Sequence, residues 1–226
     1  MIQEAFSHEQ PPLSDKELIA FREWKAGQDK PKRIIIGMSG ASGAQYGIRL
    51  LEVLTTLQIP KIETHLVVSD NTKLVLRYEM GYSDEQIDEV LKLAPYRYHN
   101  RQMEAAISSG SFKTDGMIVA PCSVKTLEHI AHGSDESLID RAALCCLKER
   151  SKLVLMFRET PLTLSMIENM RDATLNGAII LPPLPAFYHV PRTVEAIVDQ
   201  SVQKALDQFG IEANLFQRWE TPKETN

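Results

Sequence analysis

The chain has no apolar run that approaches the roughly 20 residues a helix needs to cross a bilayer, so no membrane span is expected. It also lacks an excess of positive charge, because 25 Lys and Arg against 30 Asp and Glu give a formal charge of -5. Nucleic-acid-binding domains need a basic face, so this charge argues against nucleic-acid binding. The first residues lack the basic-then-apolar pattern of a signal peptide, and their acids argue against a transit peptide.

Cysteine is scarce. The chain has three, Cys122, Cys145 and Cys146, and no two of them have the C-x-x-C spacing of a zinc or redox site. None of the six histidines stands at a metal-binding spacing either. We therefore expect no bound metal and a reduced, cytoplasmic protein. Cys122 is interpreted as a small buried residue rather than a nucleophile.

The remaining composition, with 43% hydrophobic and 24% charged residues in 226, is that of a soluble globular protein with one sizeable α/β domain. The pattern predicts three parts: an N-terminal extension over 1–32, a domain over 33–210 and a C-terminal tail over 211–226 that closes the site. In the extension, the capping-box sequence Ser14-Asp-Lys-Glu17 predicts a short amphipathic helix over 15–25. This helix is expected to pack on the domain or on a neighbouring subunit.

Short apolar stretches alternate with helical patterns along the domain. Strands are expected over 34–36, 63–68, 116–120, 153–157 and 178–181, with Pro121 ending the third, and 98–101 is a short strand or a loop. Helices are expected over 44–57, 71–78, 83–92, 123–131, 138–148, 165–176 and 193–209. This alternation predicts a three-layer, doubly wound α/β fold, with a mostly parallel sheet of the Rossmann-like or flavodoxin-like class.

The most informative stretch is 33–47, where a short strand runs into a loop of small and hydroxyl residues that opens a helix. Free amides and the helix dipole at such a start favour an anion. Gly37, Gly40 and Gly43 are spaced G-x-x-G-x-x-G, which is neither the dinucleotide fingerprint nor the Walker triphosphate loop. The loop alone predicts a phosphate or mononucleotide site, and a tight turn packed with small residues is the alternative.

Hydrogen-bonding residues follow each expected strand. They are found at 39–42, 69, 121–126, 158–160 and 186–189. In a parallel sheet the carboxyl ends of the strands share one edge, and ligands bind there. One polar strand end is ordinary, but five together indicate a binding site rather than packing. Arg158 would supply a fixed charge suited to a phosphate or a polarised ring oxygen.

These strings resemble the flavin prenyltransferase family of UbiX and Pad-type proteins over most of the chain, from about Arg33 to Trp219. The matching motifs are GMSGASGA at 37–44, ISSGSF at 107–112, PCSVKT at 121–126, LKER at 147–150, RETP at 158–161 and PPLPAFY at 182–188. The resemblance implies an enzyme that joins a dimethylallyl group from dimethylallyl phosphate to reduced FMN. The product, prenylated FMN, would serve a UbiD-type decarboxylase. It also implies a homo-oligomer, commonly a dodecamer built from trimers.

The family pattern also implies residue roles. The expected FMN-binding residues are Gly40, Ala41, Ser42, Ser69, Ser123, Val124, Lys125, Thr126 and Arg158. The residues expected to hold or enclose the prenyl phosphate are Tyr188, Lys204, Lys148, Arg158 and Trp219. The expected catalytic residues are Glu159 as proton shuttle, Glu79 as a second acid near the flavin, Ser42 and Lys148. Cations would stabilise the departing phosphate, and aromatic faces would steady a positive allyl fragment.

Two positions depart from the family pattern. Lys204 stands where arginine is common, which turns a bidentate grip into a point charge, and Leu144 stands where aspartate is usual. Three alternatives stay open: a flavin-dependent cysteine-type decarboxylase of related fold, an enzyme that itself decarboxylates an aromatic acid, and a non-catalytic flavin-carrying subunit of such a decarboxylase. The motifs at 158–161 and 185–188 argue against the first.

Overall fold

The computed structural model describes residues 14, 16, 30–57 and 61–219. The contacts divide the chain into two units, residues 1–31 and residues 32–226. Apart from Lys16, the helix predicted over 15–25 lies outside the described residues. Among the described residues, no helix is both long and apolar enough to cross a membrane.

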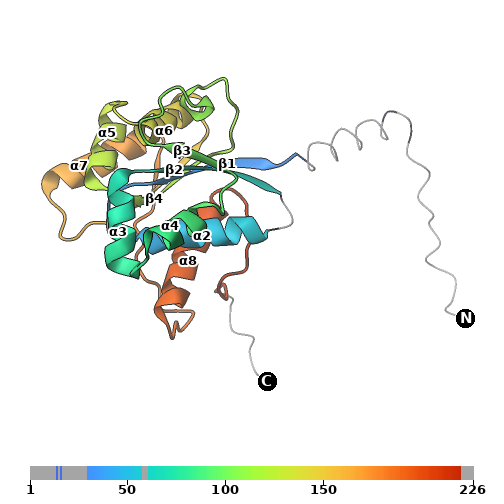
Figure 1. The fold of residues 1–226 in the computed structure, drawn as a ribbon, viewed down its shortest axis with the longest axis vertical. Helices are drawn as coiled ribbons and strands as arrows, with labels where there is room; N and C mark the ends of the chain where they lie inside the picture. The colour runs from blue at the N-terminus through green and yellow to red at the C-terminus, as the bar shows by residue number, and fades with distance from the viewer. Residues whose placement is uncertain (1–13, 15, 17–29, 58–60, 220–226) are drawn as a thin grey trace, which may run out of the picture. The chain divides into compact units, whose positions relative to one another are not determined.

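The second unit is built on a six-stranded sheet in the order β3-β2-β1-β4-β5-β6 (Figure 1). All neighbouring strands pair in parallel. The strands are β1 (Lys32–Met38), β2 (Ile62–Val68), β3 (Tyr96–His99), β4 (Gly116–Cys122), β5 (Lys152–Phe157) and β6 (Ile179–Ile180). The chain moves outward in one direction from β1 to β3 and in the other from β4 to β6. The predicted doubly wound fold is therefore confirmed, with its switch point between β1 and β4.

Helices cover both faces of the sheet (Figure 1). They are α2 (Ala44–Thr56), α3 (Asp70–Met80), α4 (Asp84–Leu91), α5 (Val124–His132), α6 (Leu138–Lys148), α7 (Leu164–Leu175) and α8 (Val194–Asp207), with a short 3₁₀ turn at Ala106–Ser108. Alternate β1 residues enter different cores, because Ile34 and Ile36 pack with α2 and α8 whereas Ile35 packs with α5 and α6. A strand buried on both faces must be apolar throughout, which explains its unbroken isoleucine run.

Serine caps set the starts of several helices. The capping box predicted at Ser83 is present, since the Ser83 hydroxyl accepts from the Gln86 amide and the Gln86 side chain accepts from the Ser83 amide. Close packing of α2 requires Gly47, because a β-carbon there would lie 2.5 Å from the carbonyl oxygen of Ala120 on β4. These two features fix where a helix begins and how closely α2 lies on the sheet.

The predicted end of the third long strand at Pro121 was wrong. β4 continues to Cys122, which pairs with Phe157 of β5 after an irregularity in the register that begins at Val119. Proline lacks an amide hydrogen, but a bulge needs no ladder bond at that position, so the strand can pass through it. The extra residues carry the chain to the loop that starts α5.

A buried histidine, His65, lies on β2 and packs against residues of β3. The His65 ring stacks on Tyr96, with centroids 4.6 Å apart, and its Nδ1 lies 3.0 Å from the Tyr98 hydroxyl. Its Nε2 lies 2.9 Å from a carboxylate oxygen of Glu63. Burial lowers the pKa of His65 below its ordinary value, and the hydrogen bond to Glu63 only partly opposes this. The fold therefore favours the neutral ring.

This ring predicts a pH-dependent loss of stability. Because the pKa of His65 is lower in the folded chain, the unfolded chain binds the proton first, and the free energy of unfolding decreases as the pH falls through about 6.5. Replacing His65 by glutamine should remove that part of the decrease, measured by urea unfolding between pH 5 and 8. The exposed His132→Gln variant is the control and should keep the wild-type slope. Equal slopes in all three proteins would contradict the assignment.

Candidate functional site

A cavity of about 750 Å³ opens at the carboxyl ends of the central strands. It brings together ten of the residues expected from the sequence: Gly40, Ala41, Ser42, Ser69, Ser123, Val124, Lys125, Thr126, Arg158 and Glu159. They come from the loops after β1, β2, β4 and β5, four strands that end at the same edge. The switch point between β1 and β4 lies within this group, where doubly wound sheets bind their ligands.

Two helices begin in the cavity wall with the same construction. Ser69 caps α3, and its hydroxyl accepts a bond of 3.3 Å from the Thr72 amide. Ser123 caps α5, and its hydroxyl accepts a bond of 3.3 Å from the Thr126 amide. Each cap leaves other first-turn amides without a helical partner, and the dipole adds partial positive charge there. Two such starts on one cavity make a suitable site for an anion.

The third helix start, at α2, is used differently. A carboxylate oxygen of Glu79 accepts from the amides of Gly43, at 2.8 Å, and Ala44, at 3.3 Å. Gly43 adopts a left-handed conformation with φ of 98°, which places its amide at this cap. The protein's own carboxylate thus occupies two amides of the turn that the sequence singled out for phosphate. Glu79 lies behind the loop and does not line the cavity.

Ser39 joins the two loops of the switch point. Its hydroxyl donates to the Pro121 carbonyl and accepts from the Ser123 amide, both at 2.8 Å. The side chain is buried, so both bonds are shielded from water. Next to it, Gly40 is needed for close packing, because a β-carbon there would lie 2.5 Å from the β-carbon of Asn71. The floor of the cavity is therefore held by a buried hydroxyl that bridges two loops and by close packing at Gly40.

Arg158 supplies a half-buried positive group at the cavity. Its amide donates to the Cys122 carbonyl at 3.3 Å, which fixes the start of the loop after β5. Its Nε is fully shielded and has no hydrogen-bond partner among the described residues. Burial raises the pKa of the nearby Tyr46 hydroxyl, and the charge of Arg158 opposes that rise. An unpaired guanidinium nitrogen is costly to bury, so this Nε is an unsatisfied donor in the wall of the cavity. Glu159 follows on the exposed side and accepts from the Thr160 amide.

Five expected residues do not line this cavity in the single chain: Glu79, Lys148, Tyr188, Lys204 and Trp219. Lys148 pairs with Glu149 at 2.7 Å, and Lys204 lies 3.7 Å from Asp207. Tyr188 and Trp219 contact each other edge to face, with centroids 6.2 Å apart. The structure thus separates the residues expected around the flavin from most of those expected around the prenyl phosphate.

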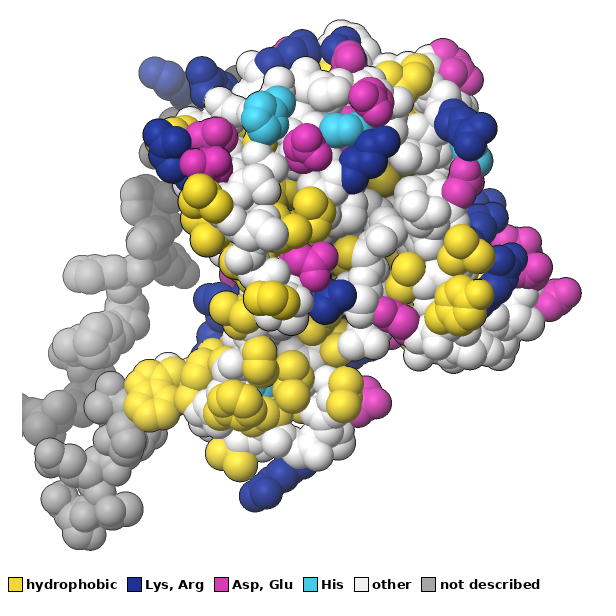
Figure 2. All heavy atoms as spheres, turned by 90° about the vertical axis from the view of Figure 1, so that its left-hand side faces the viewer, with side chains coloured by type: hydrophobic (Ala, Val, Ile, Leu, Met, Phe, Trp, Pro, Cys, Tyr) yellow, Lys and Arg dark blue, Asp and Glu magenta, His cyan; other side chains and the backbone are white. Residues whose placement is uncertain are grey.

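The aromatic pair belongs to an exposed apolar surface. Figure 2 turns the side of Figure 1 where α3, α5 and α7 lie toward the viewer, and charged and histidine side chains gather in its upper part whereas hydrophobic ones gather below. Trp219 is 70% exposed and Tyr188 is 45% exposed. The tail that carries Trp219 is tied to α8, because the buried Gln203 side chain donates to the Ile211 carbonyl and accepts from the Ala213 amide. An apolar surface of this kind is typical of an interaction face.

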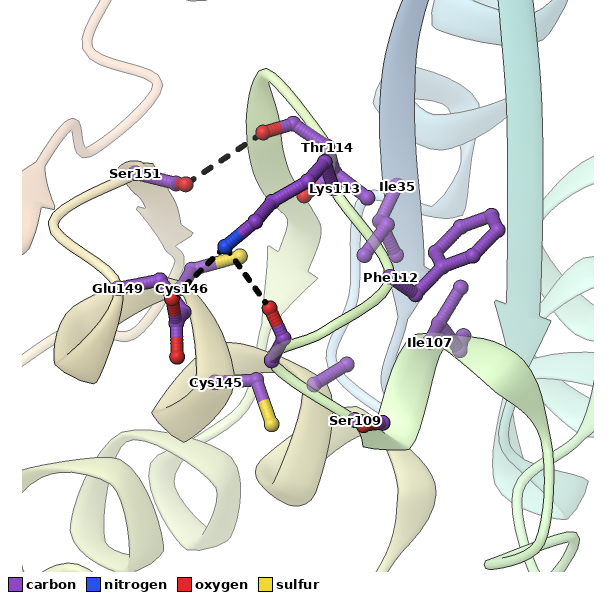
Figure 3. Close-up of a pocket in the computed structure, with 12 residues that line it drawn as sticks. Ile35, Ile107, Ser109, Phe112, Lys113, Thr114, Cys145, Cys146, Glu149 and Ser151 are labelled. Carbon is purple, nitrogen blue, oxygen red and sulfur yellow. Dashed lines mark hydrogen bonds and ion pairs between the residues drawn. The ribbon is translucent and has the colours of Figure 1, made fainter.

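A second, smaller hollow lies near the end of α6 (Figure 3). Its volume of about 20 Å³ has room for a single water molecule. Lys113 reaches across it to Glu149 and to the Gly110 carbonyl, and Cys145 and Cys146 line it. Burial raises the pKa of Cys146 to about 12 and also raises that of Cys122. Both thiols stay protonated at neutral pH, in agreement with a packing role.

Several residues of the cavity were not expected from the sequence. They are Asp70, Asn71, Asn100, Arg101, His129, Glu136, Ser137, Ile139 and Asp140. Asp70 and Asn71 follow an expected strand end, and His129 lies one helical turn after Lys125, so their positions carried a usable signal. Asp140 carried none, because its role depends on the packing of α6 against α5. Among the described residues, no group of three His, Cys, Asp or Glu side chains is arranged to hold a metal ion.

The tie at Ser39 gives a paired prediction. Ser39→Ala removes a hydroxyl with two buried hydrogen bonds and should lower the free energy of unfolding by about 1–3 kcal/mol. Ser201→Ala is the matched control, because its hydroxyl is equally buried but has no partner among the described residues, and it should be neutral or stabilising. Urea unfolding measures both. Equal destabilisation by the two changes would show that the Ser39 bonds do not hold the loops.

Known proteins share this arrangement. The Flavoprotein family matches residues 23–205. A flavin prenyltransferase UbiX of Thauera aromatica is 52% identical over 187 residues, which cover 83% of this chain and 93% of its own. Among solved structures, AnUbiX (PadA1) in complex with FMN and dimethylallyl pyrophosphate is 43% identical with a TM-score of 0.80, and the match covers 86% of this chain and all of that one.

A dodecameric FMN-dependent UbiX-like decarboxylase of Escherichia coli O157:H7 is 45% identical with a TM-score of 0.79, covering 84% of this chain and 100% of that one. The cysteine decarboxylase TvaF, at 12% identity and a TM-score of 0.54, shares the fold alone. The extent of these matches, the sequence identities and the shared fold agree with the motifs found in the sequence. The chain belongs to the UbiX-type flavin prenyltransferase family, and the enzyme is a transferase.

Proposed function

We propose that this enzyme transfers a dimethylallyl group from dimethylallyl phosphate to reduced FMN and releases prenylated FMN for a UbiD-type decarboxylase. The observation that carries the proposal is the cavity itself, where two helix starts and the side chain of Arg158 line one space. A flavin mononucleotide offers a phosphate for the helix starts and ring oxygens for the guanidinium. The AnUbiX complex with FMN and dimethylallyl pyrophosphate supports this choice of ligands.

The residues of the cavity fit a flavin mononucleotide. Gly40, Ala41 and Ser42 form the loop after β1, where the absence of large side chains lets a ligand approach the backbone. Ser69 and the residues 123–126 offer hydroxyl and amide donors from the other two loops. When bound, reduced FMN supplies the nucleophilic ring positions that accept the allyl group. The protein's part is to hold that ring in place against the donor.

The donor-binding residues must come close to this cavity, although they are separated from it in one chain. We assign Lys148, Tyr188, Lys204 and Trp219 to the prenyl phosphate, with Arg158 shared between donor and flavin. A homo-oligomer in which neighbouring subunits meet at the cavity would join the two groups, and the apolar surface at Tyr188 and Trp219 suits such a contact. The dodecameric structure of the Escherichia coli relative supports this assembly.

The reaction requires the side chains to supply positive charge, to exclude water and to transfer one proton. Cleavage of the allylic carbon–oxygen bond leaves a phosphate, which Lys148, Arg158 and Lys204 stabilise. The aromatic faces of Tyr188 and Trp219 steady the positive allyl fragment and exclude water. Closing the new ring would move one proton from a flavin carbon to the allyl double bond, and the carboxylate of Glu159 would carry it as a proton shuttle. Glu79 acts from behind the loop by fixing Gly43 and Ala44.

An anaerobic assay tests the reaction. Incubation of the purified full chain with reduced FMN and dimethylallyl phosphate should increase the flavin mass by one prenyl unit, measured by mass spectrometry, and a parallel reaction with the diphosphate compares donors. The protein alone should release no carbon dioxide from an aromatic acid. Unchanged flavin mass would refute the proposal, and decarboxylation without a partner would support the alternative of a self-sufficient decarboxylase.

Replacement of Glu159 separates a catalyst from a flavin carrier. Glu159→Gln keeps the shape and the hydrogen bond to the Thr160 amide but removes the base, so product formation should fall about 100-fold or more while FMN still binds. Glu168→Gln, an exposed acid on α7, is the control and should keep wild-type activity. If Glu159→Gln supports a UbiD-type partner as well as the wild type does, proton transfer does not depend on this residue.

A further inference from the structure

One wall of the cavity holds a histidine and a lysine around a single carboxylate oxygen. His129 and Lys125 lie one turn apart on α5, and both line the cavity. The Oε2 atom of Glu136, in the loop before α6, lies 3.4 Å from Lys125 Nζ and 3.6 Å from His129 Nε2. The other ring nitrogen of His129, Nδ1, lies 2.8 Å from Oδ2 of Asp140 on α6. Of these four residues, only Lys125 was expected from the family pattern.

Asp140 sets the direction of the His129 ring. Its side chain is 3% exposed, and a buried carboxylate needs partners. The Ser137 hydroxyl donates to the same Oδ2 atom at 2.8 Å, and the Nδ1–H of His129 is the second donor. With Nδ1 held in this way, Nε2 is directed toward Glu136 at the cavity wall. When the ring carries its second proton, Nε2–H becomes a charged donor on that wall.

Glu136 differs from Asp140 in its freedom to move. Its side chain is 64% exposed, and its contacts with Lys125 and His129 are longer than good charged hydrogen bonds. An exposed pair of this kind contributes little stability, so the carboxylate can turn toward solvent at small cost. The Glu136 oxygen marks a position from which an anionic oxygen of a ligand can contact both Lys125 Nζ and His129 Nε2.

We infer that His129 and Lys125 form a subsite for a phosphate oxygen, in which His129 is a binding residue positioned by Asp140 and Glu136 is the internal competitor that the phosphate displaces. This inference rests on the proposed function, because the phosphate belongs either to FMN or to the prenyl donor. Both sources offer the same chemistry, a doubly charged phosphate that suits two cationic donors better than one carboxylate does.

The charged groups around His129 come from three elements. Lys125 lies on its own helix, Asp140 on α6, and Glu136 in the connecting loop. The helix α7 also packs on α5, but its Arg171 and Asp172 pair with each other. Among the described residues, Asp140 and Glu136 are therefore the acids that act directly on the ring. Histidine is the side-chain type that ordinarily changes charge between pH 5 and 8, so a phosphate subsite built on one should depend on pH, whereas a histidine without ligand contact would not.

The test is a set of binding measurements on the full chain between pH 6 and 9, with FMN followed by quenching of its fluorescence. Each affinity is expressed as the ratio of the variant Kd to the wild-type Kd, because the phosphate itself loses a proton near pH 6 in every variant and this effect cancels. For His129→Gln the ratio should be about ten at pH 6 and should approach one at pH 9. Glu136→Gln should bind roughly two- to threefold more tightly, since it removes the competing charge.

Two further variants distinguish the effect of the orientation of the His129 ring from a general effect on folding. Asp140→Asn should weaken binding at pH 6 in the same direction as His129→Gln, because it releases the ring. His132→Gln, on the same helix, is the matched control and should bind as the wild type does, since His132 is exposed and contacts only the Glu128 carbonyl. Circular dichroism checks that each variant is folded. If a buried variant does not fold, the exposed Glu136→Gln variant still tests the inference.

The choice of probe identifies the source of the phosphate. For His129→Gln, a flat ratio means that the variant Kd divided by the wild-type Kd does not change with pH. If riboflavin, which has no phosphate, gives a flat ratio while FMN does not, the subsite holds the flavin phosphate. If FMN also gives a flat ratio but dimethylallyl phosphate, followed by calorimetry, gives the pH-dependent one, the subsite holds the donor. Flat ratios for both phosphates, with no effect of Glu136→Gln, would overturn the inference. Absence of FMN binding by the wild type would instead refute the proposed function.

Discussion

The site depends on the parallel pairing of β1 with β4, two strands that are neighbours in the sheet but distant in sequence. Because the chain leaves them in opposite directions, their loops diverge and leave space above the sheet. The buried hydroxyl of Ser39 fixes the width of that space by joining the β1 loop to Pro121 and Ser123. The helix starts and Arg158 can converge on a ligand only because this edge is held in place.

Three helices begin at this edge of the sheet. The partners of their first amides show which helix starts are closed by the protein itself and which are left for a ligand. At α2 the amides of Gly43 and Ala44 are satisfied by Glu79, so the turn is complete without a ligand. At α3 and α5 the serine caps satisfy an amide at the third position of the helix, and the earlier amides have no helical partner and belong to residues that line the cavity. The sequence pattern singles out the start of α2 as the anion site, and this is the start that Glu79 closes. The difference arises from one carboxylate that lies 36 residues away from the loop it closes.

Local rules were sufficient for most of the fold. The unbroken isoleucines of β1, the capping box at Ser83 and the polar residues after each strand predicted the elements and the edge on which the cavity lies. The failures are all non-local. Pro121 does not end β4 because the neighbouring strand resumes pairing at Cys122, and the buried state of Arg158 Nε depends on the packing around it. His129 lies one helical turn after Lys125, but its ring is oriented by Asp140 on another helix, which a local pattern does not show.

On the proposed function, water exclusion explains why the residues assigned to the flavin and those assigned to the donor lie in two separate regions of one chain. An allyl fragment that forms beside an open cavity would react with water before it reached the flavin. In one chain, Trp219 and Tyr188 are too exposed to form a seal, and Lys148 and Lys204 bind to neighbouring acids rather than to the cavity. If the subunits meet at this surface, assembly completes the donor site and buries the aromatic faces in the same step. On the proposed function, the isolated chain would then retain its flavin-binding half and lose the transferase reaction.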